Sequence, residues 1–291
     1  MPTLLDFRRR IRSVKNTQQI TRAMKFVSAA RLRRAQEAAL AARPFAKELV
    51  RVLRSTMARI ESPHHPLLAQ RAEERILVLV LAGERGLAGA FNANILKEAA
   101  KFFHSKRGKK IVVIPVGKKC RDALRKAGFE FAGEYVNVLA RVDLGVAREI
   151  ANLITGLYSE ERVDAVYVVF SEFKSVLAPN LVTEKLLPVE KIEDRDETEA
   201  EAASAEIDYI YEQPEQQILN RLLPRYVQTQ VLRTLLESSA AEHAARMTAM
   251  EAATKNAGEV IEGLTLHMNK VRQAAITKEI IEIVSGAAST A

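Results

Sequence analysis

The sequence is short of the residue types on which disulfide frameworks, metal centres and many active sites depend. Its 291 residues include one cysteine, Cys120, five histidines and no tryptophan, and only 5% of them are aromatic. A single cysteine excludes an intramolecular disulfide, and no group of cysteines and histidines has the spacing of metal ligands. No apolar run approaches the 18 residues of a membrane-spanning helix. We therefore predict no metal, no bound cofactor and no direct membrane span on this chain.

A catalytic constellation is absent as well. The histidines are scattered, and His243 lies in an apolar helical pattern where packing is the expected role. Residues 83–89 join a predicted strand to a predicted helix, but their G-x-x-G-x-x-G spacing differs from the G-x-G-x-x-G of dinucleotide sites. We interpret them as a tight turn and predict no nucleotide site and no catalytic residue. A nucleotide-dependent enzyme stays open as a third hypothesis behind the two considered below.

Acidic residues are nearly missing from the start of the chain, and they accumulate further on. Residues 1–34 contain ten lysines and arginines and one acid, Asp6, whereas residues 190–215 contain eleven acids. The basic segment suits nucleic-acid phosphates, an acidic protein partner or a plain solvated face, and its charge alone does not decide between them. The acidic stretch 190–206 has few apolar groups and predicts a mobile surface loop.

What the chain does have is a long apolar repeat near its end. One face of residues 236–275 follows steps of four and three without a slip. This period of 3.5 residues is typical of a left-handed coiled coil, so a partner helix must lie alongside. The residues on this face are Leu236, Ala240, His243, Met247, Met250, Thr254, Ala257, Ile261, Leu264, Met268, Val271 and Ala275.

The start of the chain predicts the partner helix, from Thr3 to about residue 61. Thr3 and Asp6 have the spacing of a capping box at its beginning. Pro44 is expected to kink the helix or force a local adjustment, and Pro63 and Pro66 are expected to end it. Helical spacing of apolar residues is kept by Ile20, Ala23, Met24, Val27 and Ala30.

Between these helices the pattern alternates between strand and helix. Apolar runs predict strands at 76–81, 111–116, 163–170 and 181–189, and helical patterns lie between them at 92–103, 118–127 and 146–158. Such alternation is typical of βαβ units and a mostly parallel sheet. The predicted fold class is therefore α/β: a long antiparallel two-helix coiled coil formed by the N- and C-terminal helices, with an inserted small α/β domain.

We divide the chain into four parts: the N-terminal coiled-coil helix at 1–61, the inserted α/β domain at 72–190, an acidic loop at 191–206, and a foot with the C-terminal coiled-coil helix at 207–287. At 1.5 Å per residue the second helix is longer than the first by roughly 25 Å. This predicts a single-helix tip past Ala275 that needs an apolar socket in another protein. The apolar residues of the tip are Ile276, Ile280, Ile283 and Val284.

Four segments resemble a known family. The resemblance is to the gamma subunits of F-type ATP synthases, above all bacterial ones, and it follows the whole chain in order except for the acidic loop. The segments are ITRAMKFVSAA at 20–30, GLAGAFN at 86–92, YIYE at 209–212 and NKVRQAAITKEIIEIVSGA at 269–287.

The resemblance implies a non-catalytic rotor shaft. In the family, the helix pair passes through a hexamer of alpha and beta subunits, the tip lies in an apolar sleeve, and the α/β domain and foot rest on the membrane c-ring with an epsilon subunit bound. Rotation of the ring by an ion flux then drives ATP synthesis, or ATP hydrolysis drives the reverse. The rival hypothesis is a basic coiled-coil protein that binds nucleic acid. A rotor shaft, in contrast, is expected to have no nucleic-acid partner.

The resemblance also implies roles for single residues. Arg22, Met24 and Lys25 would face the acidic lever loop of a beta subunit, with Arg246 at the partner position on the opposing helix. The residues implied to touch beta subunits near the tip are Arg272, Gln273, Thr277, Glu279 and Glu282. The residues implied to meet the c-ring are Tyr209, Tyr211 and Glu212. The lone cysteine excludes the two-cysteine control of plastid enzymes, and the helical pattern runs on without a cleavage site, so we expect a bacterial complex on the cytoplasmic face of the plasma (inner) membrane.

Overall fold

The computed structural model describes residues 3–60, 64–175, 179–189 and 213–290. Two long helices, α1 (Leu4–Arg59) and α6 (Glu215–Thr290), begin and end the described chain. The chain divides into two compact units, one formed by Ala29–Ala245 and the other by Met1–Ser28 with Arg246–Ala291. The tyrosines and glutamate of the predicted foot, and the acidic loop 191–206, lie outside the described residues.

The larger unit, 29–245, is built on a five-stranded sheet in the order β3-β2-β1-β4-β5. Neighbours among the first four strands are parallel, and β5 runs antiparallel to β4. The strands are β1 (Arg75–Leu81), β2 (Lys110–Val116), β3 (Glu130–Phe131), β4 (Ala165–Phe173) and β5 (Pro179–Leu187). The mostly parallel sheet is confirmed. The sequence does not predict β3, because two residues are too few for a period to appear.

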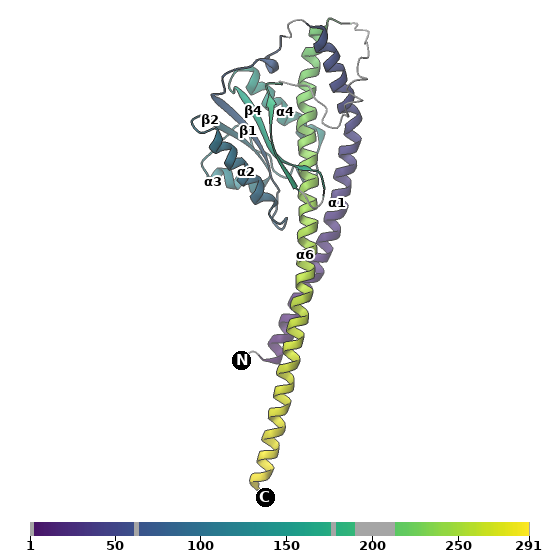
Figure 1. Cartoon of the computed structure of the whole chain (residues 1–291), viewed down its shortest axis with the longest axis vertical. Helices are drawn as coiled ribbons and strands as arrows, with labels where there is room; N and C mark the ends of the chain where they lie inside the picture. Colours follow the sequence, from purple (N-terminus) through teal and green to yellow (C-terminus); the bar gives the residue numbers. More distant parts are fainter. Residues whose placement is uncertain (1–2, 61–63, 176–178, 190–212, 291) are drawn as a thin grey trace. The chain divides into compact units, whose positions relative to one another are not determined.

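Helices cover both faces of this sheet (Figure 1). The predicted helices are present as α2 (Phe91–Ser105), α3 (Lys118–Lys126) and α4 (Leu144–Ser159), and a 3-10 turn lies at Pro66–Leu68. Even-numbered residues of β1 form one core with α2 and α3, whereas its odd-numbered residues form another with α4, α1 and α6. Burial on both faces explains why β1 is continuously apolar rather than alternating.

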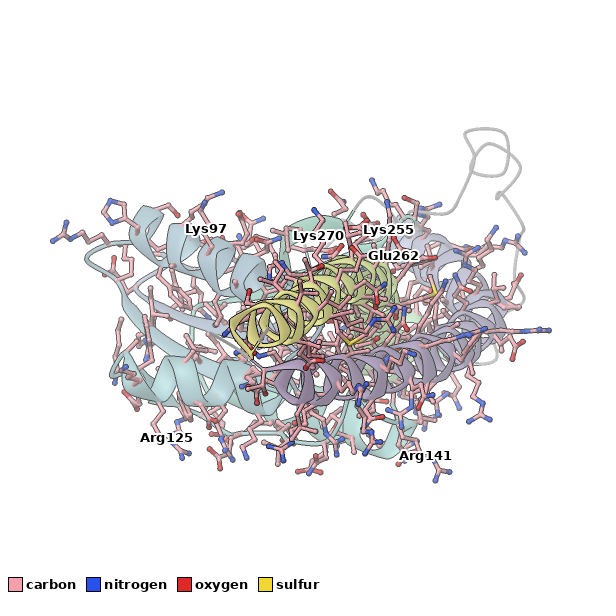
Figure 2. All side chains as sticks on the ribbon, turned by 90° about the horizontal axis from the view of Figure 1, so that it is seen from below. Lys97, Arg125, Arg141, Lys255, Glu262 and Lys270 are labelled. Carbon is pink, nitrogen blue, oxygen red and sulfur yellow. The ribbon has the colours of Figure 1, made fainter. Side chains whose placement is uncertain are left out.

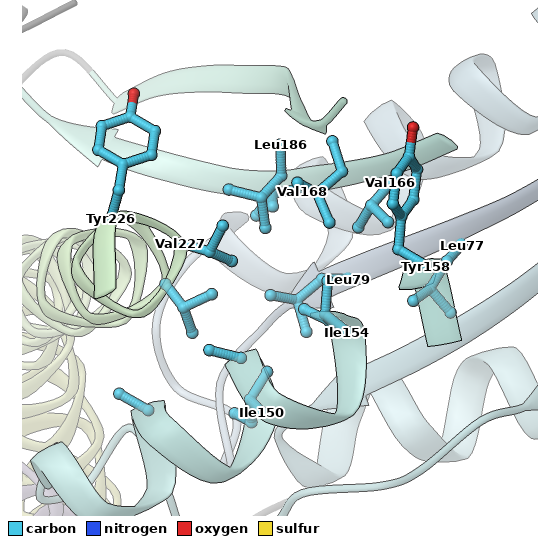
Figure 3. Packing of buried hydrophobic residues seen from close by; sticks show 14 of the residues in the cluster. Leu77, Leu79, Ile150, Ile154, Tyr158, Val166, Val168, Leu186, Tyr226 and Val227 are labelled. Atoms are coloured by element: carbon cyan, nitrogen blue, oxygen red, sulfur yellow. The ribbon is translucent and has the colours of Figure 1, made fainter. Parts of the chain in front are cut away.

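The second of these cores joins the sheet to the long helices. Figure 3 shows Leu79 and Val168 of the sheet meeting Ile150 of α4 and Val227 of α6. Leu53 of α1 is fully buried in the same cluster. Within this unit the two long helices are thus part of the hydrophobic core of the α/β domain.

In the smaller unit α1 and α6 pair in antiparallel fashion. The rings of Phe7 and His267 have centroids 5.0 Å apart, and the hydroxyls of Thr21 and Thr254 are 2.8 Å apart. Residue numbers therefore rise along α1 as they fall along α6. From Met247 to Ala275 every position of the predicted α6 repeat is buried or half-buried. The predicted coiled coil is confirmed.

The face of α1 that contacts α6 is not the one on which the apolar residues 20–30 keep helical spacing. Ile20 and Val27 are 59% and 53% exposed, and Ala23 and Ala30 are exposed too. The protected positions instead follow their own steps of three and four, which are Leu4, Phe7, Ile11, Val14, Gln18, Thr21, Lys25 and Ser28. The last four of these are polar, so hydrophobicity alone hides the repeat. Met24, half-buried, lies beside this face.

The ends of α1 agree with the sequence. Thr3 and Asp6 form the capping box: Asp6 N–H donates to Thr3 Oγ1 at 3.3 Å, and Thr3 N–H donates to Asp6 Oδ2 at 2.9 Å. The N–H and the hydroxyl of Thr3, which both donate to Asp6 Oδ2, hold the pKa of the Asp6 carboxyl below its usual value. The helix continues through Pro44 and ends at Arg59, while Pro63 lies outside the described residues.

Candidate functional site

The end of α6 carries a bare apolar tip, defined here as residues 276–285. All ten of these residues are exposed, whereas Ala275 before them is half-buried. The apolar side chains and their exposed fractions are Ile276 48%, Ile280 56%, Ile281 58%, Ile283 72% and Val284 61%. Except for Ile281, which the sequence reasoning missed, they recur at steps of four, three and one and share one helix face. Such a stripe is typical of a surface that another protein covers.

Polar side chains surround the base of the tip. The residues Arg272, Gln273, Thr277, Glu279 and Glu282 are all exposed. Thr277 Oγ1 donates to the backbone oxygen of Gln273 at 2.9 Å, and Lys278 Nζ lies 3.5 Å from Glu282 Oε1. Both contacts stay within one turn of the same helix. An exposed ion pair of this kind contributes only about 0–1 kcal/mol, so a partner can replace it at little cost.

The second predicted contact region lies on α1. Arg22 is exposed, and Met24, Lys25 and Arg246 are half-buried. Lys25 Nζ lies 2.5 Å from Glu251 Oε1. Because Thr21 is opposite Thr254, Met24 is level with about residue 251 and some five residues from Arg246. The structure thus places Lys25 beside Glu251. This partner could not be predicted without the register of the two paired helices.

The same region has a polar interior and an apolar exterior. Gln18 Nε2 donates to Thr254 O at 3.4 Å, the Thr21 hydroxyl meets that of Thr254, and Ser28 is buried. A Cβ added to Gly258 would lie 3.2 Å from Gln18 Nε2, so a glycine gives the glutamine room. Polar residues in a coiled-coil seam fix the register at some cost in stability. On the outside, Ile20, Phe26 and Val27 are exposed.

Charged side chains cover the rest of the helix pair. Lys255, Glu262 and Lys270 are exposed and lie on the side of α6 turned away from α1 (Figure 2). On α1 the exposed basic residues of this unit are Arg8, Arg9, Arg10, Arg12, Lys15 and Arg22. Acidic and basic groups are interspersed on α6 in this unit, whereas α1 presents mainly positive charge.

Residues 83–89 form the tight turn that their spacing predicts. Gly83 N–H donates to Asn92 Oδ1 at 2.8 Å, and Asn92 Nδ2 donates back to Arg85 O at 3.2 Å. The backbone reaches positive φ at Leu87 and Gly89 (61° and 55°). His243 is packed in the interior, with 3% of its surface exposed.

Groups with reactive chemistry are sparse in the part of the chain that the structure describes. No cluster of three or more histidine, cysteine, aspartate or glutamate residues there could hold a metal ion. Burial raises the pKa of the Cys120 thiol to about 12, so the thiol stays protonated at neutral pH. Nor does any helix among these residues contain a stretch that is apolar enough to traverse a bilayer.

A groove of about 1500 Å³ opens within the larger unit, between α1, β5 and α6. Its wall contains a charge cluster of Glu172, Glu184, Arg233 and Glu237. Arg233 Nη2 lies 3.1 Å from Glu184 Oε2, and Arg233 Nη1 lies 3.2 Å from Glu237 Oε1. The other oxygen of Glu237 is buried without a hydrogen-bond partner. Burial, reinforced by the like charges of Glu172 and Glu184, raises the pKa of the Glu237 carboxyl although Arg233 opposes the shift.

This raised pKa predicts a stabilising substitution. A carboxyl whose pKa is higher in the folded chain costs stability as the pH rises from its ordinary value, 4.5, through the folded one. Glu237→Gln removes that cost and keeps an oxygen for Arg233. We expect its melting temperature to exceed that of the unsubstituted chain by roughly 2–4 °C at pH 8.

The pH profile provides the control for this substitution. The gain should shrink as the pH falls to 4.5 and approach zero below that value, where the Glu237 side chain is protonated in both the folded and the unfolded chain. Thermal unfolding followed by circular dichroism between pH 4.5 and 8 measures it. A gain that does not change with pH would point to packing rather than to charge.

Comparisons with known proteins complete the description of the site. Residues 3–290 match the family described as ATP synthase. The chain is 49% identical to the ATP synthase gamma chain of Solibacter usitatus and 45% identical to that of Pelotomaculum thermopropionicum, each match covering 99% of both chains. Among solved structures it resembles a chain of the Tetrahymena thermophila mitochondrial ATP synthase central stalk/c-ring (TM-score 0.59, 23% identity, 80% of this chain and 99% of that one). It also resembles a chain of the Euglena gracilis mitochondrial enzyme (TM-score 0.68, 19% identity, 99% and 94%). These two structures support the fold.

Proposed function

The chain belongs to the family of ATP synthase gamma chains, and we infer that it is the central rotor shaft of a rotary ATP synthase. The observation that carries this inference is the end of α6, which continues past its paired segment as an exposed apolar helix. A paired helix is stiff enough to transmit torque. A bare apolar end can turn inside an apolar collar, because hydrophobic contact has no preferred direction.

The partners follow from this role. The tip and the contact region around Met24 bind a hexamer of alpha and beta subunits, and the α/β domain and the foot bind the c-ring and an epsilon subunit. One solved relative is described as a central stalk with its c-ring and another as a rotor, which supports the assignment. The predicted c-ring residues Tyr209, Tyr211 and Glu212 remain a proposal on sequence grounds.

The chain itself is a non-catalytic subunit, and ATP is made at the alpha–beta interfaces. Its two core clusters fill both faces of the sheet with side chains. The α/β domain therefore acts as a packed domain that rotates with the shaft. The complex lies at the membrane through the c-ring, and we place this chain on the cytoplasmic face of a bacterial plasma (inner) membrane.

Reconstitution tests the assignment directly. The purified chain, mixed with alpha and beta subunits, should restore ATP hydrolysis and co-purify with them in a fixed stoichiometry. The rival reading predicts instead that the chain is retained on DNA with a steep dependence on salt, since phosphate contacts release counterions. Strong DNA retention without any hydrolysis in the mixture would overturn the shaft assignment.

The contact region on α1 makes its own prediction. Met24→Lys adds a cation next to Lys25, at the level of Glu251, and a second lysine there competes for the single carboxylate. We expect the ratio of ATP-driven proton pumping to ATP hydrolysis to fall at least two-fold while the complex still assembles. Pumping in membrane vesicles, normalised to hydrolysis and to the amount of complex, measures this.

Met24→Leu is the matched control, because it keeps the volume and lacks the charge. It should pump like the unsubstituted complex. Equal losses of assembly and pumping in Met24→Lys would argue against a steering role for this segment.

A further inference from the structure

Helix α6 contacts the edge of the sheet at which α/β domains of this kind bind their ligands. The strand order reverses between β1 and β4, and ligands of such folds lie outside the carboxyl ends of the strands at that point. Here two segments that follow carboxyl ends contact α6 instead. They are the turn after β1, at Gly83, and the loop after β3, at Leu139. The chain thus occupies its own ligand crevice with a helix.

Glu242 is the α6 residue at the turn. It is 3% exposed, and a Cβ built on Gly83 would lie 2.7 Å from Glu242 Oε1 and 2.9 Å from its Cδ. Gly83 has little freedom to retreat, since its N–H donates to Asn92 Oδ1 at 2.8 Å and its oxygen accepts from Lys119 N–H at 3.2 Å. The carboxylate therefore lies against a backbone that is held on both sides.

Two further polar contacts join α6 to the same domain. Ser239 Oγ donates to the backbone oxygen of Leu139 at 2.8 Å, and both residues are buried. Arg233 reaches Glu184 on β5 at 3.1 Å, and its guanidinium lies over the ring of Phe170. Both hydrogen-bonded contacts are directional, unlike the apolar packing around them.

The positions of these residues around the helix matter as much as their bonds. With 3.6 residues per turn, Arg233 and Glu242 are about half a turn apart around the axis and about 13 Å apart along it. Contacts on different sides of a helix oppose its rotation about its own axis. One apolar stripe opposes such rotation less, because hydrophobic contact is non-directional.

We propose that three anchor residues, Arg233, Ser239 and Glu242, prevent helix α6 from rotating about its own axis relative to the α/β domain. Torque then passes between the helix and the domain. The anchor residues are positioning residues that touch no nucleotide. The proposal rests on the rotor function above, because it matters only if the α/β domain and the helix must turn together. If the helix rotates relative to the domain, ATP hydrolysis in the hexamer continues but turns the c-ring less.

The assembled complex tests the proposal through coupling. Ser239→Ala and Glu242→Ala should each lower the ratio of proton pumping to ATP hydrolysis at least two-fold, and the double variant should lower it further. Hydrolysis itself should stay within two-fold of the unsubstituted complex. Glu242→Gln keeps the shape of the side chain and should restore most of the ratio. Ser239→Ala removes one hydroxyl, so it keeps the test open should Glu242→Ala fail to assemble.

The contact between Gly83 and Glu242 has a separate test. Gly83→Ala pushes the carboxylate away and should lower the same ratio, whereas Gly86→Ala in the same turn meets nothing within 4 Å and should not. The double variant Gly83→Ala, Glu242→Ala should lower the pumping ratio by less than the sum of the two single losses. The new Cβ at position 83 then has no carboxylate to collide with.

The results separate the two levels of inference. An unchanged pumping ratio in the assembled Ser239→Ala, Glu242→Ala double variant would overturn the anchor, and so would strictly additive losses at Gly83 and Glu242. If the rotor function itself were wrong, even the unsubstituted chain would restore no hydrolysis with alpha and beta subunits.

Discussion

A chain that ends at Gln273 is expected to lose most of its ability to support ATP hydrolysis with alpha and beta subunits, while its α/β domain stays folded. The cut removes the whole apolar tip, 276–285, which packs against nothing else in its unit. Burying a large aliphatic side chain contributes about 1.5–3 kcal/mol, so five of them in a collar represent several kcal/mol of binding. Loss of that much should weaken association at least a hundred-fold.

Two measurements keep binding apart from folding. Titration of the hexamer with the chain gives the affinity. Thermal unfolding of the chain alone should keep its midpoint within about 2 °C, because both core clusters consist of residues before Arg246 and lose none of them.

Substitutions at full length provide the matched control. Replacing Ile276, Ile280 and Ile283 by serine should reproduce the loss, whereas replacing the exposed Lys278 by serine should weaken binding far less. An affinity unchanged by the truncation would contradict a bearing role for the tip.

The two long helices show how far a sequence pattern reaches. The repeat of α6 is apolar except at His243 and Thr254, and the structure protects the predicted positions from Met247 to Ala275. On α1 the apolar spacing of Ile20 and Val27 lies on the outer face. The seam there is occupied by polar residues, which are Gln18, Thr21, Lys25 and Ser28. A hydrophobic repeat identifies the buried face of a helix only where the buried residues are apolar. Where polar groups satisfy one another across a seam, the pattern reverses.

Other features depend on contacts that no local pattern contains. Glu251 became visible as the partner of Lys25 only through the antiparallel register. The charge cluster around Arg233 joins two strands to α6, and the approach of Glu242 to Gly83 joins residues far apart in the chain. The bare tip could be predicted, because it follows from the difference in length between two helices. Its bearing role remains a proposal that rests on that difference in length and on the composition of the tip.

Gly117→Ala is expected to have the largest effect on folding of any substitution considered. This glycine joins β2 to α3 with φ at 99°, and a Cβ there would lie 1.9 Å from the backbone oxygen of Ala82. Its own N–H donates to Tyr135 O at 2.7 Å, and Ala82 N–H donates to Val116 O at 2.9 Å, so neither strand can move aside. We expect a loss of about 4 kcal/mol or more in the free energy of unfolding, which is the range reserved for severe core defects.

Gly108→Ala isolates the cause of that loss. Gly108 has a similar φ of 95°, but a Cβ there meets nothing within 4 Å. It should therefore show only the conformational strain of a left-handed residue, about 1–2 kcal/mol. Denaturant unfolding of both variants measures the difference between their losses in the free energy of unfolding. That difference is the cost of the collision with the Ala82 oxygen. Equal losses would mean that the strands at this edge can separate, and the domain would then be too soft to transmit torque between the c-ring and the helix pair.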